Sequence, residues 1–138
     1  MKPLEVLEEA RVAVASDQDI VSARMRGRAM ALQLGFRPTD ATLIATAISE
    51  LARNMLLYAK SGEIVICPIE NGERKGLAVR ARDEGPGIPD TTRALQDGYS
   101  TSGRLGLGLP GVRRLMDEFE LASQVGRGTT VVVKKWNG

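Results

Sequence analysis

The order in which helical and strand-like segments follow one another is the feature that most constrains the fold of this chain. Apolar residues recur every three or four positions in some segments and every second position in others, which separates helices from strands. Strands are expected at about residues 11–15, 63–69, 76–83, 118–125 and 129–135, and helices at about residues 16–34, 38–59, 90–96 and 109–117. Because no β-α-β units alternate along this order, we predict an α+β fold with one mixed sheet and helices packed on one face.

Local signals set the expected element ends. Gly35 and Gly62 are expected to end the first two helices, since glycine readily adopts the backbone conformation found after a helix. A polar hairpin at residues 70–75, with an Asn-Gly step, is expected to join the second and third strands.

The length and charge of the chain limit its organisation and its partners. A chain of 138 residues is most simply one domain, which we place at residues 1–138. The net charge of +2 is too small to predict nucleic acid or an anionic membrane as a partner. Residues 1–10 have no apolar segment typical of a signal peptide, and no stretch approaches the roughly eighteen apolar residues of a membrane span. We therefore expect a soluble, cytoplasmic protein.

Histidine is absent from the chain, and this excludes several kinds of chemistry. There is no Ser-His or Cys-His pair, no imidazole zinc site and no phosphohistidine, so acid–base chemistry must depend on carboxylates. The one cysteine, Cys67, lies in an apolar strand-like segment and forms no internal disulfide. We interpret it as a small buried hydrophobic residue rather than a nucleophile.

Glu50 and Asn54 form the first candidate site. Their i, i+4 spacing places both on one side of the second helix, next to an apolar stripe that runs from Ile44 to Met55. They can be two solvated polar residues. Alternatively, Asn54 supplies an oxygen to Mg²⁺, which takes few protein ligands, and Glu50 deprotonates an attacking hydroxyl one turn away.

Asp83 ends an apolar strand and is followed by a glycine- and proline-rich turn. It continues the alternation of buried residues in its strand, and a carboxylate on that face is costly unless a group donates to it. The exocyclic amine of adenine is a suitable donor, and Gly85 and Gly87 would let the backbone lie close to a flat base. The alternative is that Asp83 caps the turn through its own backbone.

A glycine-rich segment precedes the fourth expected helix. Gly106, Gly108 and Gly111 surround its start, where Pro110 fits the first helical position. Free amides and the helix dipole make such an end attractive to phosphate, although a plain capping loop has the same composition. Thr129 is expected on the inward face of the last strand, either as a core residue or as a hydroxyl near Asp83 that contacts the base.

Together and in this order, these segments resemble the GHKL (Bergerat-fold) ATPases and kinases, which include gyrase, Hsp90, histidine kinases and MutL. The matching segments are Glu50–Asn54, Asp83–Gly87, Gly106–Gly108 and Gly128–Thr129. Within the superfamily, the short single-domain form is similar to bacterial anti-sigma-factor serine kinases, above all to the RsbT-type switch kinases of the stressosome. The resemblance extends from about Ser16 to Trp136.

The resemblance implies a two-layer α/β sandwich of the Bergerat type that uses Mg²⁺ and ATP to phosphorylate serine or threonine on STAS-domain proteins. In the stressosome these are antagonist and scaffold proteins, and their phosphorylation frees the kinase to activate a PP2C-type phosphatase. Glu50 is then the catalytic base and Asn54 the metal ligand, with Arg104 near the γ-phosphate. The residues implied to bind the nucleotide are Asn54, Asp83, Gly85, Gly87, Ile88, Arg104, Gly106, Leu107, Gly108 and Thr129.

Other functions remain open on the sequence alone. One is a kinase that also binds and inhibits a sigma factor directly. Another is a non-catalytic binding module controlled by nucleotide, but such a module needs Asn54 and Asp83 without a base, so Glu50 argues against it. A detached ATP domain of a histidine kinase is disfavoured, because the chain has neither an acceptor histidine nor a dimerisation helix pair.

Overall fold

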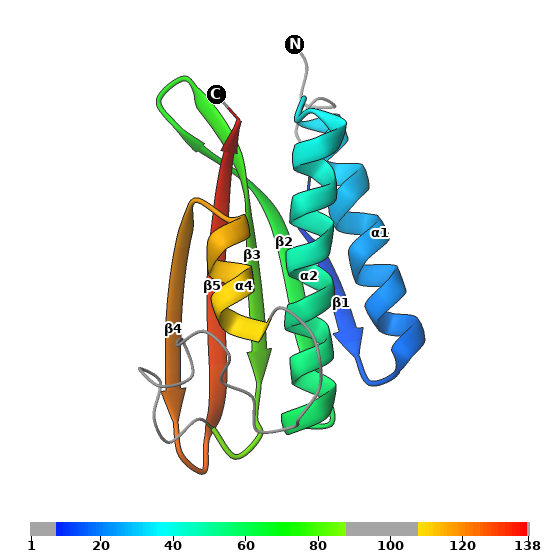
Figure 1. The fold of residues 1–138 in the computed structure, drawn as a ribbon, viewed down its shortest axis with the longest axis vertical. Helices are drawn as coiled ribbons and strands as arrows, with labels where there is room; N and C mark the ends of the chain where they lie inside the picture. Colours follow the sequence, from blue (N-terminus) through cyan, green and yellow to red (C-terminus); the bar gives the residue numbers. More distant parts are fainter. Residues whose placement is uncertain (1–7, 88–107, 138) are drawn as a thin grey trace.

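The computed structural model describes residues 8–87 and 108–137, which form a five-stranded sheet covered on one face by three helices (Figure 1). In chain order the elements are β1 (Ala10–Val14), α1 (Asp17–Gln33), α2 (Pro38–Tyr58), β2 (Gly62–Asn71), β3 (Arg74–Asp83), α4 (Gly108–Leu115), β4 (Glu118–Gln124) and β5 (Gly128–Asn137). The predicted α+β class and two-layer arrangement are confirmed. The helix expected at residues 90–96 lies outside the described residues.

The strands lie in the order β1-β2-β3-β5-β4, and each neighbouring pair is antiparallel. The prediction of a mixed sheet is therefore wrong. The reason is that α1 and α2 run in opposite directions, so together they return the chain to the end of the sheet where β1 finished (Figure 1). β2 then runs beside β1 in the opposite direction. In the same way α4 and β4 bring the chain back so that β5 runs against β3.

The core lies between the helices and the sheet, and α2 supplies its centre. The predicted apolar stripe of α2 is buried, with exposures of 3% or less at Ile44, Ile48, Leu51 and Met55. The sheet contributes alternate residues from its helix-facing side, such as Leu77 and Val79 of β3 and Val133 of β5, all fully buried. Burial of each such side chain stabilises the fold by about 1.5–3 kcal/mol. This packing holds α2 firmly over the middle of the sheet.

The two predicted helix-ending glycines behave differently. Gly35 follows α1 with a φ of +92°, and its N–H donates to the carbonyl of Leu32 at 3.0 Å, as expected for a helix end. After α2 the left-handed residue is Lys60, with a φ of 72°. Gly62 instead begins β2, where a Cβ atom would lie 2.7 Å from Cγ of Met55. The prediction that Gly62 ends α2 is wrong, because packing rather than conformation requires glycine there.

The hairpin between β2 and β3 is tighter than the sequence predicts. Asn71 pairs with Arg74, so the ladder continues through most of the polar segment and Gly72 and Glu73 alone form the turn. Gly72 has a φ of +66°, in keeping with the predicted Asn-Gly turn.

At this same end of the sheet, Trp136 links β5 to the start of β4. Its backbone N–H donates to Oδ2 of Asp117 at 2.7 Å, and its indole Nε1 donates to Oε2 of Glu118 at 2.6 Å. The guanidinium of Arg74 lies 4.9 Å from the ring centroid. These contacts hold β3, β4 and β5 together at the end of the sheet opposite to Asp83.

Candidate functional site

The first part of the candidate site lies on the C-terminal half of α2. Glu50 and Asn54 are partly buried beside the apolar stripe, as their spacing predicts. The side chain of Glu50 is 13% exposed, and its Oε2 accepts a hydrogen bond from Nη1 of Arg53 in an i, i+3 ion pair. Sequence reasoning passed over Arg53, although its position one turn after Glu50 is the spacing at which helix ion pairs form.

The second part lies where β3 ends. Asp83 is partly buried, while Arg82 before it is exposed, so Asp83 follows the helix-facing alternation of its strand as predicted. Its Oδ1 accepts a hydrogen bond from the backbone N–H of Gly85 at 2.9 Å. Asp83 therefore does cap its own turn, as the alternative interpretation proposed. A carboxylate has a second oxygen, however, and within the described part of the chain only Oδ1 is engaged in this way.

Thr129 lies directly beside Asp83 in the sheet. The two residues are opposite partners in the β3–β5 register, and Thr129 is in turn paired with Ser123 of β4. The hydroxyls of Thr129 and Ser123 are 2.9 Å apart, and Ser123 also donates to the carbonyl of Gly128 at 3.2 Å. A polar row thus crosses three strands on the helix-facing side.

Ser123 is a member of this row that sequence reasoning missed. The alternation of partly buried Phe119, Leu121 and Ser123 in β4 could have indicated its inward direction. The predicted inward placement of Thr129 matches the structure. Its hydroxyl is fixed by Ser123, a partner that was not predicted.

Glycines allow the turn after Asp83 to pack closely against the rest of the protein. A Cβ atom on Gly85 would lie 2.5 Å from Cβ of Ala59, at the end of α2. Gly87 has a φ of +81°, and a Cβ atom there would lie 2.8 Å from the carbonyl carbon of Gln124. These neighbours are protein atoms, so the structure gives both glycines a packing reason. Their predicted contact with a base stays a prediction.

The start of α4 supplies the third part of the site. Gly108 is its first residue and has a φ of +63°; α4 packs on α2, and its Val112 is fully buried in the core. Pro110 is therefore the third helical residue, and the prediction that it is the first is wrong. Ile88, Arg104, Gly106 and Leu107, together with most of the glycine-rich loop, lie outside the described residues.

These parts meet at one end of the molecule. The C-terminal half of α2, the N-terminus of α4, the end of β3 and the start of β5 all lie in the lower half of Figure 1. The contact between Gly85 and Ala59 joins the Asp83 turn to the end of α2. A carboxylate beside an amide, a second carboxylate beside a hydroxyl and a helix N-terminus therefore lie at the same end of the molecule. That set provides acceptors for a base, oxygen for a metal and amides for phosphate.

Comparison with known proteins identifies the family to which this arrangement belongs. Residues 39–137 match the family of histidine kinase-, DNA gyrase B- and HSP90-like ATPases. The chain belongs to this family. The GHKL resemblance of the sequence is confirmed, and the matched region contains every predicted site residue.

Individual relatives narrow the class of GHKL protein. The chain is 51% identical to the serine/threonine-protein kinase RsbT of Bacillus subtilis (strain 168) over 129 residues, which cover 94% of this chain and 97% of RsbT. It is 30% identical to the anti-sigma F factor of Thermoanaerobacter sp. (strain X514), with 91% and 90% of the two chains covered. The prediction that the chain is a protein kinase of the GHKL family is therefore confirmed.

A solved structure confirms the fold independently. A crystal structure of the RsbU and RsbW domains of a Mycobacterium tuberculosis protein matches with a TM-score of 0.61 at 18% identity, and covers 94% of this chain and 32% of that one.

Among residues 8–87 and 108–137, no helix has the length and apolar character needed to cross a bilayer.

Proposed function

We propose that this GHKL kinase transfers the γ-phosphate of ATP to a serine or threonine of a STAS-domain protein and acts as a partner switch in a bacterial stress response. The similarity to RsbT along nearly all of both chains supports the proposal. The structural observation that carries it is the position of Glu50 and Asn54, one turn apart on α2, at the end of the molecule where Asp83 and Thr129 pair.

Asp83 would recognise adenine. Its Oδ1 is held by the N–H of Gly85, so the carboxylate is fixed in orientation before any ligand arrives. The remaining oxygen can accept from the exocyclic amine of the base. Thr129, opposite Asp83 and fixed by Ser123, would place its hydroxyl beside the same base or beside a bridging water.

Asn54 would hold Mg²⁺. An amide oxygen with a carboxylate one turn earlier suits this ion, which binds one or two protein oxygens and completes its shell with water and phosphates. When bound, Mg²⁺ would offset the negative charge of the phosphates. The backbone of Gly108 at the start of α4, with Gly106 and Leu107 before it, would donate to phosphate oxygens, and Arg104 would lie near the γ-phosphate.

Glu50 would act as the general base. It would accept the proton of the partner's hydroxyl as that oxygen bonds to the γ-phosphorus and the bond from phosphorus to ADP breaks. Its low exposure favours this role, because the carboxylate is largely shielded from bulk water.

The test is transfer of labelled phosphate from ATP to a purified STAS-domain protein of the same organism. Glu50→Gln should keep ATP affinity and slow transfer by about 10²–10⁴-fold. Asn54→Ala should instead lose Mg²⁺-dependent nucleotide binding. Glu120→Gln, which changes an exposed glutamate of β4, and Asn71→Ala, at the hairpin, are the matched controls.

The outcomes separate the assigned roles. Transfer by Glu50→Gln at the wild-type rate would remove Glu50 as the base, and normal Mg²⁺-ATP affinity in Asn54→Ala would remove the metal ligand. If the intact protein transfers no phosphate to any STAS-domain protein, the proposed substrate class fails.

The partner switch completes the proposal. Phosphorylation of the cytoplasmic STAS partner would release the kinase, which would then bind and activate a PP2C-type phosphatase. A second candidate function follows from the similarity to the anti-sigma F factor, namely direct binding and inhibition of a sigma factor. A pull-down with purified sigma factor, with and without ATP, distinguishes the two.

A further inference from the structure

Arg53 lies inside the candidate site, although the site as described above gives it no role. Its Nη1 donates to Oε2 of Glu50, the proposed base, and Asn54 is the next residue along α2. Glu50, Arg53 and Asn54 therefore lie within little more than one turn of α2, so the proposed base, a cation and the proposed metal ligand are neighbours.

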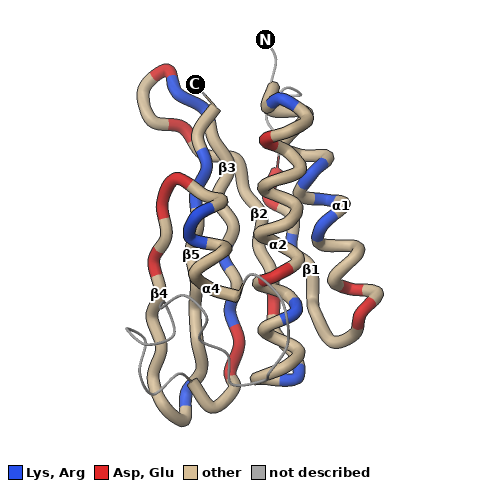
Figure 2. Tube along the Cα trace, viewed as in Figure 1, with Lys and Arg blue, Asp and Glu red and all other residues tan. Residues whose placement is uncertain are grey.

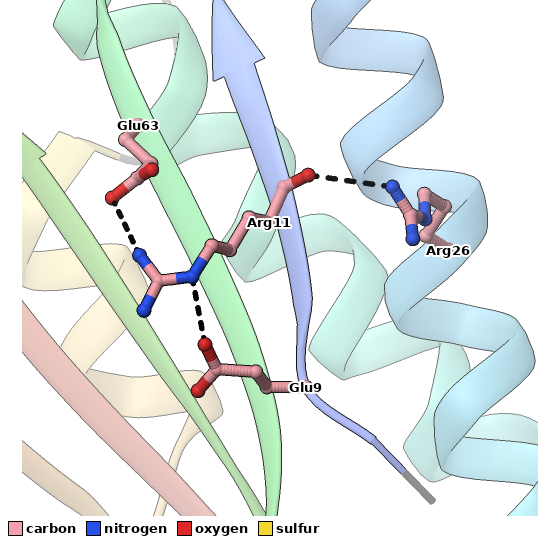
Figure 3. A network of polar contacts seen from close by, with 4 residues as sticks. All are labelled: Glu9, Arg11, Arg26 and Glu63. Carbon is pink, nitrogen blue, oxygen red and sulfur yellow. Dashed lines mark hydrogen bonds and ion pairs between the residues drawn. The ribbon is translucent and has the colours of Figure 1, made fainter.

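The carboxylate of this ion pair is less exposed than those of the Arg11 pairs and that of the Lys134–Glu118 pair, where Glu118 is 48% exposed. Figure 3 shows Arg11 of β1 paired with Glu9 and Glu63, whose side chains are 45% and 40% exposed, while Arg11 is 55% exposed. Water screens such pairs, and they contribute little. In the pair on α2, Glu50 is 13% exposed and Arg53 is 35% exposed. The charge interaction is therefore screened less, and the carboxylate has fewer water molecules with which to exchange partners.

The geometry of the pair restricts the carboxylate. A glutamate side chain has three rotatable bonds, so an unpaired Glu50 could adopt several orientations at the margin of the core. The planar guanidinium of Arg53 donates in fixed directions from the same helix face, one turn away. It engages Oε2 and so restricts the directions that the carboxylate can take.

We propose that Arg53 is a positioning residue for phosphotransfer, which holds the Glu50 carboxylate in the orientation that meets the incoming hydroxyl. The inference rests on the proposed role of Glu50 as the base. A purely structural role is the alternative, since an i, i+3 ion pair also stabilises a helix slightly. The two roles predict different kinetics.

The experiment compares Arg53→Ala and Arg53→Lys with wild type in the same STAS phosphotransfer assay. Arg53→Ala should lower kcat by about 10- to 100-fold, the effect of losing one charge-assisted hydrogen bond to the base, with KM for ATP changed by less than about twofold. Arg53→Lys should recover part of the rate, because it keeps the charge and loses the fork. Arg24→Ala, at one of the exposed arginines among the basic positions of α1 (Figure 2), controls for the loss of a surface cation.

A double-mutant cycle tests whether Arg53 acts through Glu50. In the Glu50→Gln background, Arg53→Ala should lower kcat by less than about threefold, because there is no carboxylate left to orient. An equal loss in both backgrounds would overturn the inference, since Arg53 would then act on another group. Full activity of Arg53→Ala beside a slow Glu50→Gln would overturn it while leaving the proposed function intact. Full activity of Glu50→Gln would remove Glu50 as the base and overturn the inference at its premise, while the transfer itself would still support the proposed kinase.

Discussion

Replacing Asp83 by asparagine should separate the structural role of this residue from its role in base recognition. The amide oxygen of asparagine can still accept the 2.9 Å hydrogen bond from the N–H of Gly85, so the turn should keep its shape. The other carboxylate oxygen becomes an NH₂ group. It would then face the amine of adenine, and two donors cannot satisfy each other.

The magnitude follows from the loss of one partly buried hydrogen bond. Leaving such a group unsatisfied costs about 1–3 kcal/mol, so the Kd for ATP should rise by roughly 5- to 150-fold. GTP presents an oxygen at the same position, which the new NH₂ group can donate to. Affinity for GTP should therefore improve in Asp83→Asn, and the preference for adenine should narrow or reverse.

Calorimetric titration with ATP and with GTP measures both affinities, and thermal unfolding reports whether the turn survives. Asp117→Asn is a matched control, because Oδ2 of Asp117 accepts a backbone N–H from Trp136 at 2.7 Å at the opposite end of the sheet. Asp83→Ala, which also removes the bond to Gly85, should cost about 0.5–1.5 kcal/mol of folding stability that Asp83→Asn retains. A folded Asp83→Asn protein with wild-type affinities for both nucleotides would refute the assignment.

Two further properties can be tested. Gly128→Ala should lower the free energy of unfolding, measured in urea, by about 1–3 kcal/mol, because φ is +121° and a new Cβ atom would lie 2.8 Å from Cα of Glu84. Gly72→Ala, at a φ of +66° with open space around it, controls for conformational strain alone. An equal loss of stability in both variants would contradict the packing argument. Cys67 is partly rather than fully buried, and this burial, helped by the nearby charge of Glu9, raises the pKa of its thiol. Less thiolate is then present at a given pH, so iodoacetamide should alkylate the native protein more slowly at pH 8 than the urea-unfolded chain, and equal rates would contradict this.

Features that depend on local periodicity could be predicted from the sequence. The stripe of α2 that includes Ile44 and Ile48 is buried, because a helix of that length presents residues three and four apart to the same neighbour. The inward direction of Asp83 and Thr129 followed from alternation in the same way. The positions of these residues within the site could thus be inferred from their own strands and helices.

Features that depend on contacts between distant segments could not be predicted. Gly62 has the composition of a helix end, but it is held by packing on Met55, which no local pattern reveals. The direction of strand pairing depends on how the helices return the chain, so the mixed sheet was wrong. Ser123 and Arg53 are a different case, because local signals were present: alternation along β4 indicates the inward direction of Ser123, and helix spacing places Arg53 beside Glu50.

The position of β1 has a consequence for the order in which the protein is built. β1 is made first, yet it joins the sheet at an edge, through β2, whose pairing residues follow about fifty positions later. During synthesis the buried face of β1, formed by Ala10, Val12 and Val14, must wait until both helices and β2 have emerged. Closing that long loop costs more entropy than forming the tight β2–β3 hairpin, so β1 is expected to dock late and to detach early under denaturing conditions. The first strand of the chain is therefore expected to be among the last to pair with the folded sheet.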